Sequence, residues 1–203
     1  MVAARERYDE YVSCVCRRFC IGANVRVDEL GRHRRGISVR YRGRMPTPDF
    51  ILELRSMVGH HPLWLPGVTA LVVDERGLVL MVQRSDNGIW TLPSGIAEPG
   101  EEMAFACARE VLEETGVVVQ VEELISIQTV GPVTYPNNDV TSYVDHFFRC
   151  RPIGGTAVVG DDESLAVGWF APDELPEPGT ARTPKQLAIA AEHAVSGRTL
   201  FGV

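Results

Sequence analysis

The sequence has little in common with membrane or secreted proteins. It contains no apolar run of the about 20 residues that a membrane-spanning helix needs. Charged side chains such as Glu6, Asp9 and Arg17 interrupt its first twenty residues, so these do not form the apolar core of a secretory signal. Its five cysteines are scattered and odd in number, which argues against a disulfide framework. We therefore expect a cytoplasmic protein with no membrane partner.

The first 44 residues differ in charge from the rest of the chain. They contain 11 Arg and 5 Asp or Glu, a net charge of +6, whereas residues 45–203 carry 9 basic and 22 acidic residues, a net charge of −13. Arg-rich, Gly-punctuated segments without an apolar stripe are typically disordered. We interpret residues 1–44 as a poorly ordered basic extension and expect no nucleic-acid partner. Two alternatives stay open: a basic arm for nucleic acid, and a metal site of His33 with the C-x-C-x3-C cysteines, a spacing unlike that of structural zinc.

A more regular pattern follows, and we expect one domain over residues 45–203. Thr47 has the side chain of a helix N-cap, and Pro48 suits the first turn of a helix. Residues 50–58 then show the apolar spacing of a short amphipathic helix. Gly59 is expected to end it.

Further apolar runs indicate strands on both sides of a central helix. Residues 67–74 and 78–84 predict a hairpin whose first strand is buried on both faces. Three later runs predict strands of a mixed sheet, at residues 117–130, 142–150 and 165–170, with a loop at 131–139 between the first two. An Ala-rich helix follows and ends at Gly197, and five of its residues are expected to face the sheet: Leu187, Ala190, Ala191, Ala194 and Val195.

The most regular feature of the chain lies between Gly95 and Val117. This run, GIAEPGEEMAFACAREVLEETGV, fits the pattern G-x5-E-x7-R-E-U-x-E-E-x-G-U, in which U is aliphatic. The acidic pair Glu101 and Glu102 predicts the start of a helix, because negative side chains suit the positive end of the helix dipole. Gly116 predicts its end, because glycine readily takes a left-handed conformation.

Three carboxylates of this helix, Glu110, Glu113 and Glu114, stand at i, i+3 and i+4 and therefore project from one side. Hard oxygen ligands of this kind suit Mg²⁺ or Mn²⁺, and the alternative is a solvated acidic face. The apolar residues of the helix recur at three- and four-residue steps and predict a face that packs on a core, formed by Ala104, Ala108, Val111 and Leu112.

The run resembles the signature of the Nudix hydrolases, which cleave nucleoside diphosphates linked to another moiety. The resemblance implies an α/β fold, the Nudix-type α/β/α sandwich with a mixed β-sheet between helices. It also implies that Arg109 forms a structural ion pair with Glu101. The implied ligands of Mg²⁺, or of Mn²⁺, are three glutamates and one backbone carbonyl: Glu110, Glu113, Glu114 and Ser94. Glu110 is alternatively the general base.

Four residues are candidates for binding a small-molecule nucleotide substrate. Arg84 stands at the end of a predicted strand and is a candidate phosphate partner. Trp90 either packs beside the site or closes the sheet as a half-buried aromatic residue. The resemblance associates a proline shortly after the motif, here Pro132, with ADP-ribose cleavage, and a tyrosine slightly further on, here Tyr135, with dinucleoside polyphosphate cleavage. These two cues conflict, and turn packing is the alternative for both residues.

Glu163 completes the set of candidate catalytic residues. It lies in an acidic turn, residues 161–163, before the last predicted strand. A carboxylate at this place can bind metal or orient water as a general base. A solvated turn is the alternative. We expect metal-dependent hydrolysis of ADP-ribose or a similar diphosphate sugar. A triphosphate pyrophosphatase for oxidised nucleotides and a non-catalytic regulator are the alternatives, and a homodimer stays open.

Overall fold

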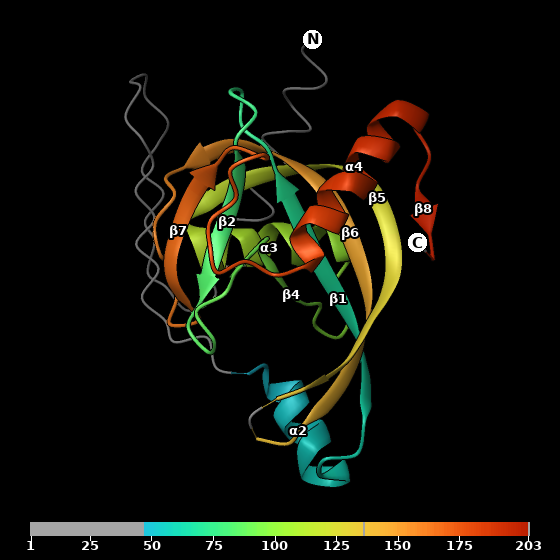
Figure 1. Ribbon diagram of the computed structural model, residues 1–203. Coiled ribbons are helices and arrows are strands. Elements are labelled where there is room, and N and C mark those ends of the chain that lie inside the picture. The colour runs from blue at the N-terminus through green and yellow to red at the C-terminus, as the bar shows by residue number, and fades with distance from the viewer. Residues whose placement is uncertain (1–46, 136, 203) are drawn as a thin grey trace, which may run out of the picture. The chain divides into compact units, whose positions relative to one another are not determined.

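The computed structural model describes residues 47–135 and 137–202 (Figure 1). The predicted extension over residues 1–44 therefore lies outside the described residues. None of the helices in the described part is long and apolar enough to cross a bilayer. The elements of this part, in chain order, are α2 (Asp49–Val58), β1 (Leu63–Val72), β2 (Val79–Arg84), β3 (Trp90–Thr91), β4 (Ser94–Ile96), α3 (Met103–Thr115), β5 (Val117–Thr134), β6 (Val140–Gly155), β7 (Ser164–Phe170), α4 (Arg182–Ser196) and β8 (Leu200–Phe201).

The strands form two sheets. The larger is mixed, with the order β4-β1-β6-β5-β8, in which β1 and β6 are parallel while β5 and β6 are antiparallel. The smaller is antiparallel, with the order β3-β2-β7. The prediction that β1 and β2 pair as a hairpin is wrong, because the two strands belong to different sheets. They are joined only by a bridge between Val73 and Val79. Both edges of β1 are occupied by β4 and β6, which leaves no edge for β2.

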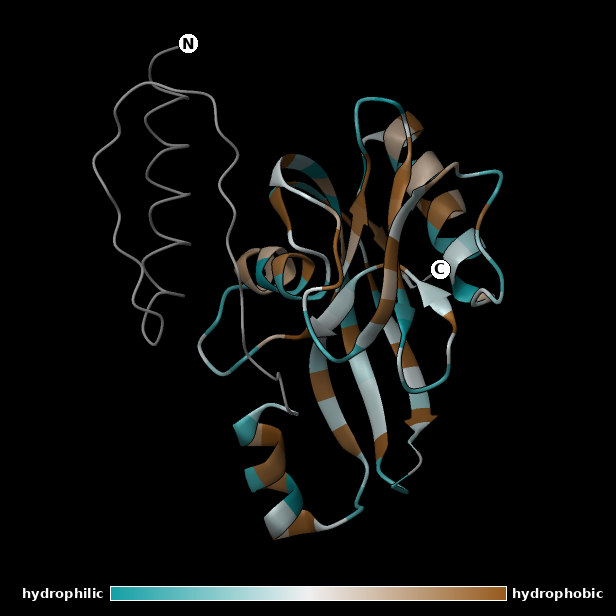
Figure 2. Cartoon of the chain, turned by 90° about the vertical axis from the view of Figure 1, so that its left-hand side faces the viewer, coloured by the Kyte–Doolittle hydropathy of each residue, from teal (hydrophilic) through white to brown (hydrophobic). Residues whose placement is uncertain are grey.

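Helices α3 and α4 cover opposite faces of the mixed sheet. Successive side chains of a strand point to opposite faces, and β1 packs alternate residues into two apolar clusters. One cluster joins it to α3 and contains Val68, Ala70, Val72, Ala106, Cys107 and Val111. The other joins it to α4 and contains Leu71, Ile125, Phe147, Leu187 and Ala190. Brown, apolar bands alternate with paler ones along the strands, and most of the loops are teal (Figure 2). The predicted α/β class, a mixed sheet between helices, is confirmed, as is the burial of β1 on both faces.

Helix α2 begins one residue later than its predicted cap implies. Its N-cap is Pro48, whose carbonyl accepts the N–H groups of Ile51 and Leu52 at 2.8 and 3.2 Å, and no side chain caps the helix. Thr47 therefore lies one residue before the N-cap and does not cap the helix. The predicted end is confirmed, because Gly59 has a φ of 59° and donates its N–H to the Arg55 carbonyl at 2.8 Å.

Helix α3 runs close to its predicted bounds but turns a slightly different face to the core. It begins at Met103, after both residues of the acidic pair, and ends before Gly116, which has a φ of 68°. Ala106 and Cys107 are fully buried, whereas Ala104 and Leu112 of the predicted face are only half-buried. Cys107 and Cys150, the two cysteines of the described part, are free thiols buried in the core.

The predicted face of α4 is wrong for three of its residues. Ala191, Ala194 and Val195 are exposed, and the side chains that α4 buries most fully are Thr183, Gln186 and His193. Burying the small side chain of alanine contributes little free energy, because it removes little apolar surface from water. The positions of the alanines therefore did not determine which face of α4 packs on the sheet. Of the buried polar side chains, His193 has a partner on the sheet beneath, Oε2 of Glu123, at 3.2 Å from its Nε2.

Strand β5 continues through the region expected to be a loop. Pro132 lies within it, at a register shift between Val130 and Val133 in the pairing with β6. Proline is tolerated in a sheet at such irregularities. The connection to β6 is correspondingly short, and in it the N–H of Tyr135 donates to the Asp139 carbonyl at 2.9 Å.

Candidate active site

The last two turns of α3 pack against β4 with almost no intervening space. The N–H of Ser94 donates to Oε2 of Glu114 at 3.1 Å, and the N–H of Ile96 donates to Oε1 of Glu110 at 3.2 Å. Between these residues, a Cβ on Gly95 would lie 2.0 Å from Cδ of Glu110. The glycine that opens the motif is therefore needed for the helix carboxylates to reach the strand.

Arg109 is the centre of a buried ion-pair network. Its Nε and Nη2 donate to the two oxygens of Glu101 at 3.0 and 2.9 Å. Its Nη1 donates to Glu110 at 2.8 Å and to Glu113 at 2.9 Å, and its Nη2 also donates to the Ile96 carbonyl at 3.0 Å. The expected pair of Arg109 with Glu101 is thus present in the structure, and the same guanidinium orients two of the three helix carboxylates.

Glu114 is a buried carboxyl group with several other carboxyl groups nearby. Burial raises the pKa of its carboxyl well above the ordinary value, and the nearby carboxylates Glu110, Asp161 and Glu163 raise it further. The Ser94 N–H acts in the opposite direction. Burial also raises the pKa of Glu110, and it raises the pKa of Glu113 to about 7 although Arg109 acts against it. The solvated acidic face considered above is excluded for Glu113 and Glu114, which are buried.

The acidic turn before β7 is tied to the end of α3. The N–H of Val158 donates to the Thr115 carbonyl at 2.9 Å, and the N–H of Gly160 donates to the Glu114 carbonyl at 3.1 Å. These bonds satisfy carbonyls that the end of a helix leaves without partners. They also bring Asp161 and Glu163 close enough to influence the helix carboxylates. Glu163 itself is exposed, as the alternative of a solvated turn implies. Partial desolvation, followed by the Asp161 charge, raises the pKa of its carboxyl.

The donor set fits a divalent cation. Glutamate oxygens are hard ligands, and the crowded, buried carboxylates around Glu114 need positive charge. The residues that could hold the ion are Glu110, Glu113 and Glu114, with the Ser94 carbonyl. Within the described residues no three His, Cys, Asp or Glu side chains converge as a ready metal cage. Glu110 and Glu114 each accept a backbone N–H of β4.

Arg84 and Tyr135 lie near this cluster. Asp86 is the main cause of the raised pKa of Arg84, and the charges of Tyr135 and Glu114 contribute, which places all three near the guanidinium. The hydroxyl of Tyr135 lies 2.5 Å from that of Tyr143, a residue that the sequence did not indicate. The structure therefore brings together a cationic and a phenolic group beside the carboxylates.

Trp90 packs within the domain, whereas Pro132 is exposed. The ring of Trp90 lies edge-on to Phe170, with 5.0 Å between centroids, and its backbone N–H donates to the Pro178 carbonyl at 2.8 Å. Trp90 therefore matches the alternative of a half-buried aromatic residue that closes the sheet. Pro132 lies inside β5, so the loop predicted at residues 131–139 is wrong at this residue. Its role in ADP-ribose cleavage stays a prediction.

A polar cluster that the sequence did not indicate lies between the mixed sheet and the start of α4. Asp145 is 4% exposed, and its carboxylate accepts the Thr69 hydroxyl at 2.8 Å and a hydrogen bond from Nη2 of Arg182. Gln128 stands opposite Asp145 in the β5–β6 register. Nearby buried atoms without a hydrogen-bond partner are Nε2 of Gln128, Oγ1 of Thr183 and Nε2 of Gln186.

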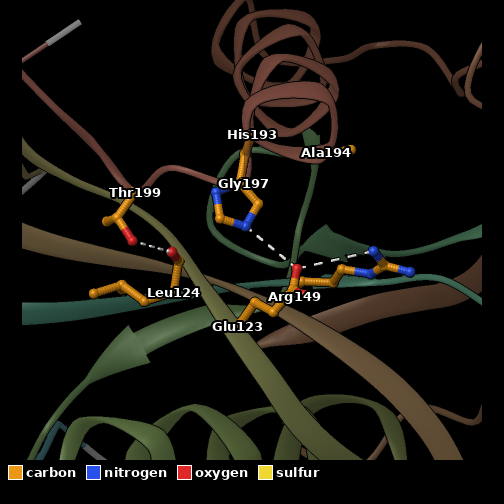
Figure 3. A pocket seen from close by; sticks show the side chains of 7 residues that line it. All are labelled: Glu123, Leu124, Arg149, His193, Ala194, Gly197 and Thr199. Atoms are coloured by element: carbon orange, nitrogen blue, oxygen red, sulfur yellow. Dashed lines mark hydrogen bonds and ion pairs between the residues drawn. The ribbon is translucent and has the colours of Figure 1, made fainter.

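A separate polar depression of about 360 Å³ lies at the other end of α4 (Figure 3). Its charged side chains are already paired. Nε2 of His193 lies 3.2 Å from Oε2 of Glu123, which is 3.9 Å from Nη1 of Arg149. None of the predicted site residues lines it, so it is distinct from the carboxylate cluster.

Comparison with known proteins agrees with the geometry. The family model described as the NUDIX domain matches residues 63–190. A MutT-like protein of Streptomyces ambofaciens is 40% identical over 116 residues, which cover 57% of this chain and 70% of the relative. Human 8-oxo-dGDP phosphatase NUDT18 is 36% identical over 138 residues, covering 64% of this chain but only 40% of the relative's length. The crystal structure of an ADP-ribose pyrophosphatase from Streptococcus suis aligns with a TM-score of 0.53 at 26% identity, covering 68% of this chain and 97% of that one.

Proposed function

The chain belongs to the NUDIX domain family, and from this we propose that it hydrolyses the diphosphate bond of a nucleoside diphosphate derivative. One observation carries the proposal: buried carboxylates of α3 crowd against β4 and the acidic turn, in a place that needs positive charge. The predicted enzyme class, a Nudix pyrophosphohydrolase, agrees with the names of the relatives.

Nudix hydrolases as a family use divalent cations such as Mg²⁺. In this chain Glu110, Glu113 and Glu114, with the Ser94 carbonyl, would hold Mg²⁺ or Mn²⁺. When bound, the ion supplies positive charge against the diphosphate oxygens and lowers the pKa of water. Arg109 then acts indirectly, because it fixes the carboxylates of Glu110 and Glu113.

The remaining residues supply binding and proton transfer. The oxygen of water forms a bond to phosphorus while the bond to the leaving phosphate breaks, and the leaving group keeps the electron pair. Glu163 accepts the proton of that water. The upward shift of its pKa makes it a stronger base than an ordinary carboxylate. Arg84 donates to the diphosphate oxygens.

Oxidised purine nucleotides are the first substrate class. The curated relatives described above, at 40% and 36% identity, include a MutT-like protein and an enzyme named for 8-oxo-dGDP. ADP-ribose, the choice that Pro132 favoured in the sequence, is the second class, and the solved Streptococcus suis enzyme supports it.

A substrate panel tests the proposal. The purified chain with Mg²⁺ is assayed against 8-oxo-dGDP, 8-oxo-dGTP, ADP-ribose, sugar nucleotides and dinucleoside polyphosphates. We expect an oxidised purine nucleotide to exceed ADP-ribose in kcat/KM by at least about tenfold, or about 1.4 kcal/mol of transition-state stabilisation. A tenfold preference for ADP-ribose would establish the second class instead. Hydrolysis of none of the panel would contradict the proposed function.

A further inference from the structure

The turn between β2 and β3 holds an Arg–Asp pair beside the acidic cluster. Nε of Arg84 donates to Oδ1 of Asp86 at 2.9 Å, and Nη2 of Arg84 donates to Oδ2 at 2.7 Å. The two side chains are 40% and 38% exposed. The pair is thus bidentate, which fixes the plane of the guanidinium, while the guanidinium stays accessible to a ligand.

The backbone that carries this pair is itself held in place. The N–H of Arg84 donates to the Ile89 carbonyl at 3.0 Å, which closes the turn. The N–H of Ser85 donates to the carbonyl of Glu163 at 2.7 Å, which joins the turn to the acidic turn before β7. The pairing of β2 with β7 shifts register at Arg84, and an irregularity of this kind re-aims a side chain.

Arg84 also lies near Glu114 and Glu163, two carboxylates of the proposed active site. The charge of Arg84 lowers the pKa of Glu163, and the charge of Glu114 raises the pKa of Arg84. A guanidinium free to move would be drawn towards these carboxylates. The bidentate bond to Asp86 opposes such a movement.

We propose that Asp86 is a positioning residue that holds Arg84 ready for a substrate phosphate and away from Glu114 and Glu163. A guanidinium has five N–H donors, of which the Asp86 pair uses two, and the others remain for phosphate oxygens. The inference rests on the proposed function, in which Arg84 contacts the diphosphate. It assigns to Asp86 a favourable effect on anion binding, although Asp86 is itself an anion.

The test measures binding of methylenediphosphonate, a diphosphate that the enzyme cannot hydrolyse, by calorimetry on the full chain with Mg²⁺. Asp86→Asn is expected to weaken binding by about fivefold and Arg84→Ala by about tenfold, because a hydrogen bond to a charged group is lost or misaligned. In the Arg84→Ala background, Asp86→Asn should change binding by less than about twofold. In kinetics, Asp86→Asn should raise KM and leave kcat within about twofold.

A matched control is Glu122→Gln, which alters another partly exposed carboxylate paired with arginine, at 2.9 Å from Nε of Arg151. It should leave binding unchanged. Equal or tighter binding by Asp86→Asn would overturn the proposal and make Asp86 a competing anion. The same weakening with and without Arg84 would also overturn it. Either result is compatible with hydrolysis of the substrate panel, so failure of this inference is distinguishable from failure of the proposed function.

Discussion

Gly95 and Glu110 share one space: a Cβ on Gly95 would lie 2.0 Å from Cδ of Glu110 and 2.2 and 2.4 Å from its two oxygens. Gly95→Ala therefore forces the Glu110 carboxylate away from the Ile96 N–H. We expect turnover to fall by at least about a hundredfold and stability to fall by about 1–3 kcal/mol through overpacking. Steady-state kinetics and urea unfolding measure the two effects.

The control for this substitution is Gly154→Ala. A Cβ at Gly154 would meet only Cβ of Val118, at 3.9 Å, an ordinary contact. This variant should retain activity. If Gly95→Ala were as active as the parent, the close approach of α3 and β4 would not matter for catalysis.

Glu114→Gln removes the charge that a divalent cation needs and preserves the shape of the side chain. We expect turnover to fall by at least about a hundredfold, the scale of losing one main electrostatic stabiliser. The metal-free variant should melt at a higher temperature than the metal-free parent, because a buried charge is removed while the amide oxygen still accepts the Ser94 N–H. Glu102→Gln, an exposed change in the same motif, serves as the control. Unchanged turnover in Glu114→Gln would contradict the proposed metal ligand.

Arg109→Lys tests the ion-pair network. An ammonium group cannot meet both oxygens of Glu101 together with Glu110, Glu113 and the Ile96 carbonyl. We expect a loss of about 3 kcal/mol in the free energy of unfolding, because buried carboxylates are left without full compensation. Urea unfolding measures this loss. Arg151→Lys, at a partly exposed pair, should cost less than about 0.5 kcal/mol, and an equally small loss at Arg109 would show that the network does not stabilise the fold.

The stability of the metal-free protein should fall between weakly acidic and neutral pH. Burial raises the pKa of Glu113 from 4.5 to about 7. The folded state thus binds its proton more tightly than the unfolded state, so this stabilisation is complete below pH 4.5 and is lost as the pH rises to about 7. With a chelator present, the Tm should be higher at about pH 5.5 than at about pH 7.5, and Glu113→Gln should flatten this dependence. Added Mg²⁺ should stabilise the protein more at the higher pH, because metal ligands must be deprotonated. A Tm that rises with pH in the metal-free parent would contradict the assigned direction.

A fragment of residues 45–203 should fold and react without the preceding residues. The change of charge near residue 45 motivates this prediction. The Tm should stay within about 3 °C of that of the full chain, which corresponds to less than about 1 kcal/mol, and kcat/KM should stay within about twofold at low and at moderate salt. Loss of folding or of most activity would show that residues 1–44 are an integral part of the domain.

The sequence predicted the features of the site that are local along the chain. The bounds of α3, the left-handed Gly116 and the helix carboxylates follow from spacings within one short run. The separation of β1 and β2 into two sheets was not predictable in this way, because it depends on strands β6 and β7 that are distant in the sequence. The same limit applies to Asp145 and Arg182, which meet only in the fold.

The short segment that leads into the acidic turn cannot change in length without effect, because its backbone is attached to the end of α3. A Cβ on Gly160 would lie 1.9 Å from the Glu113 carbonyl oxygen, and the Gly160 N–H is bonded to the next carbonyl of α3. Any insertion or deletion between Val158 and Asp161 would therefore either break this attachment or shift the acidic turn along the helix. The number of residues in this short stretch, together with the glycine at position 160, sets the distance between the carboxylates of the turn and those of the helix.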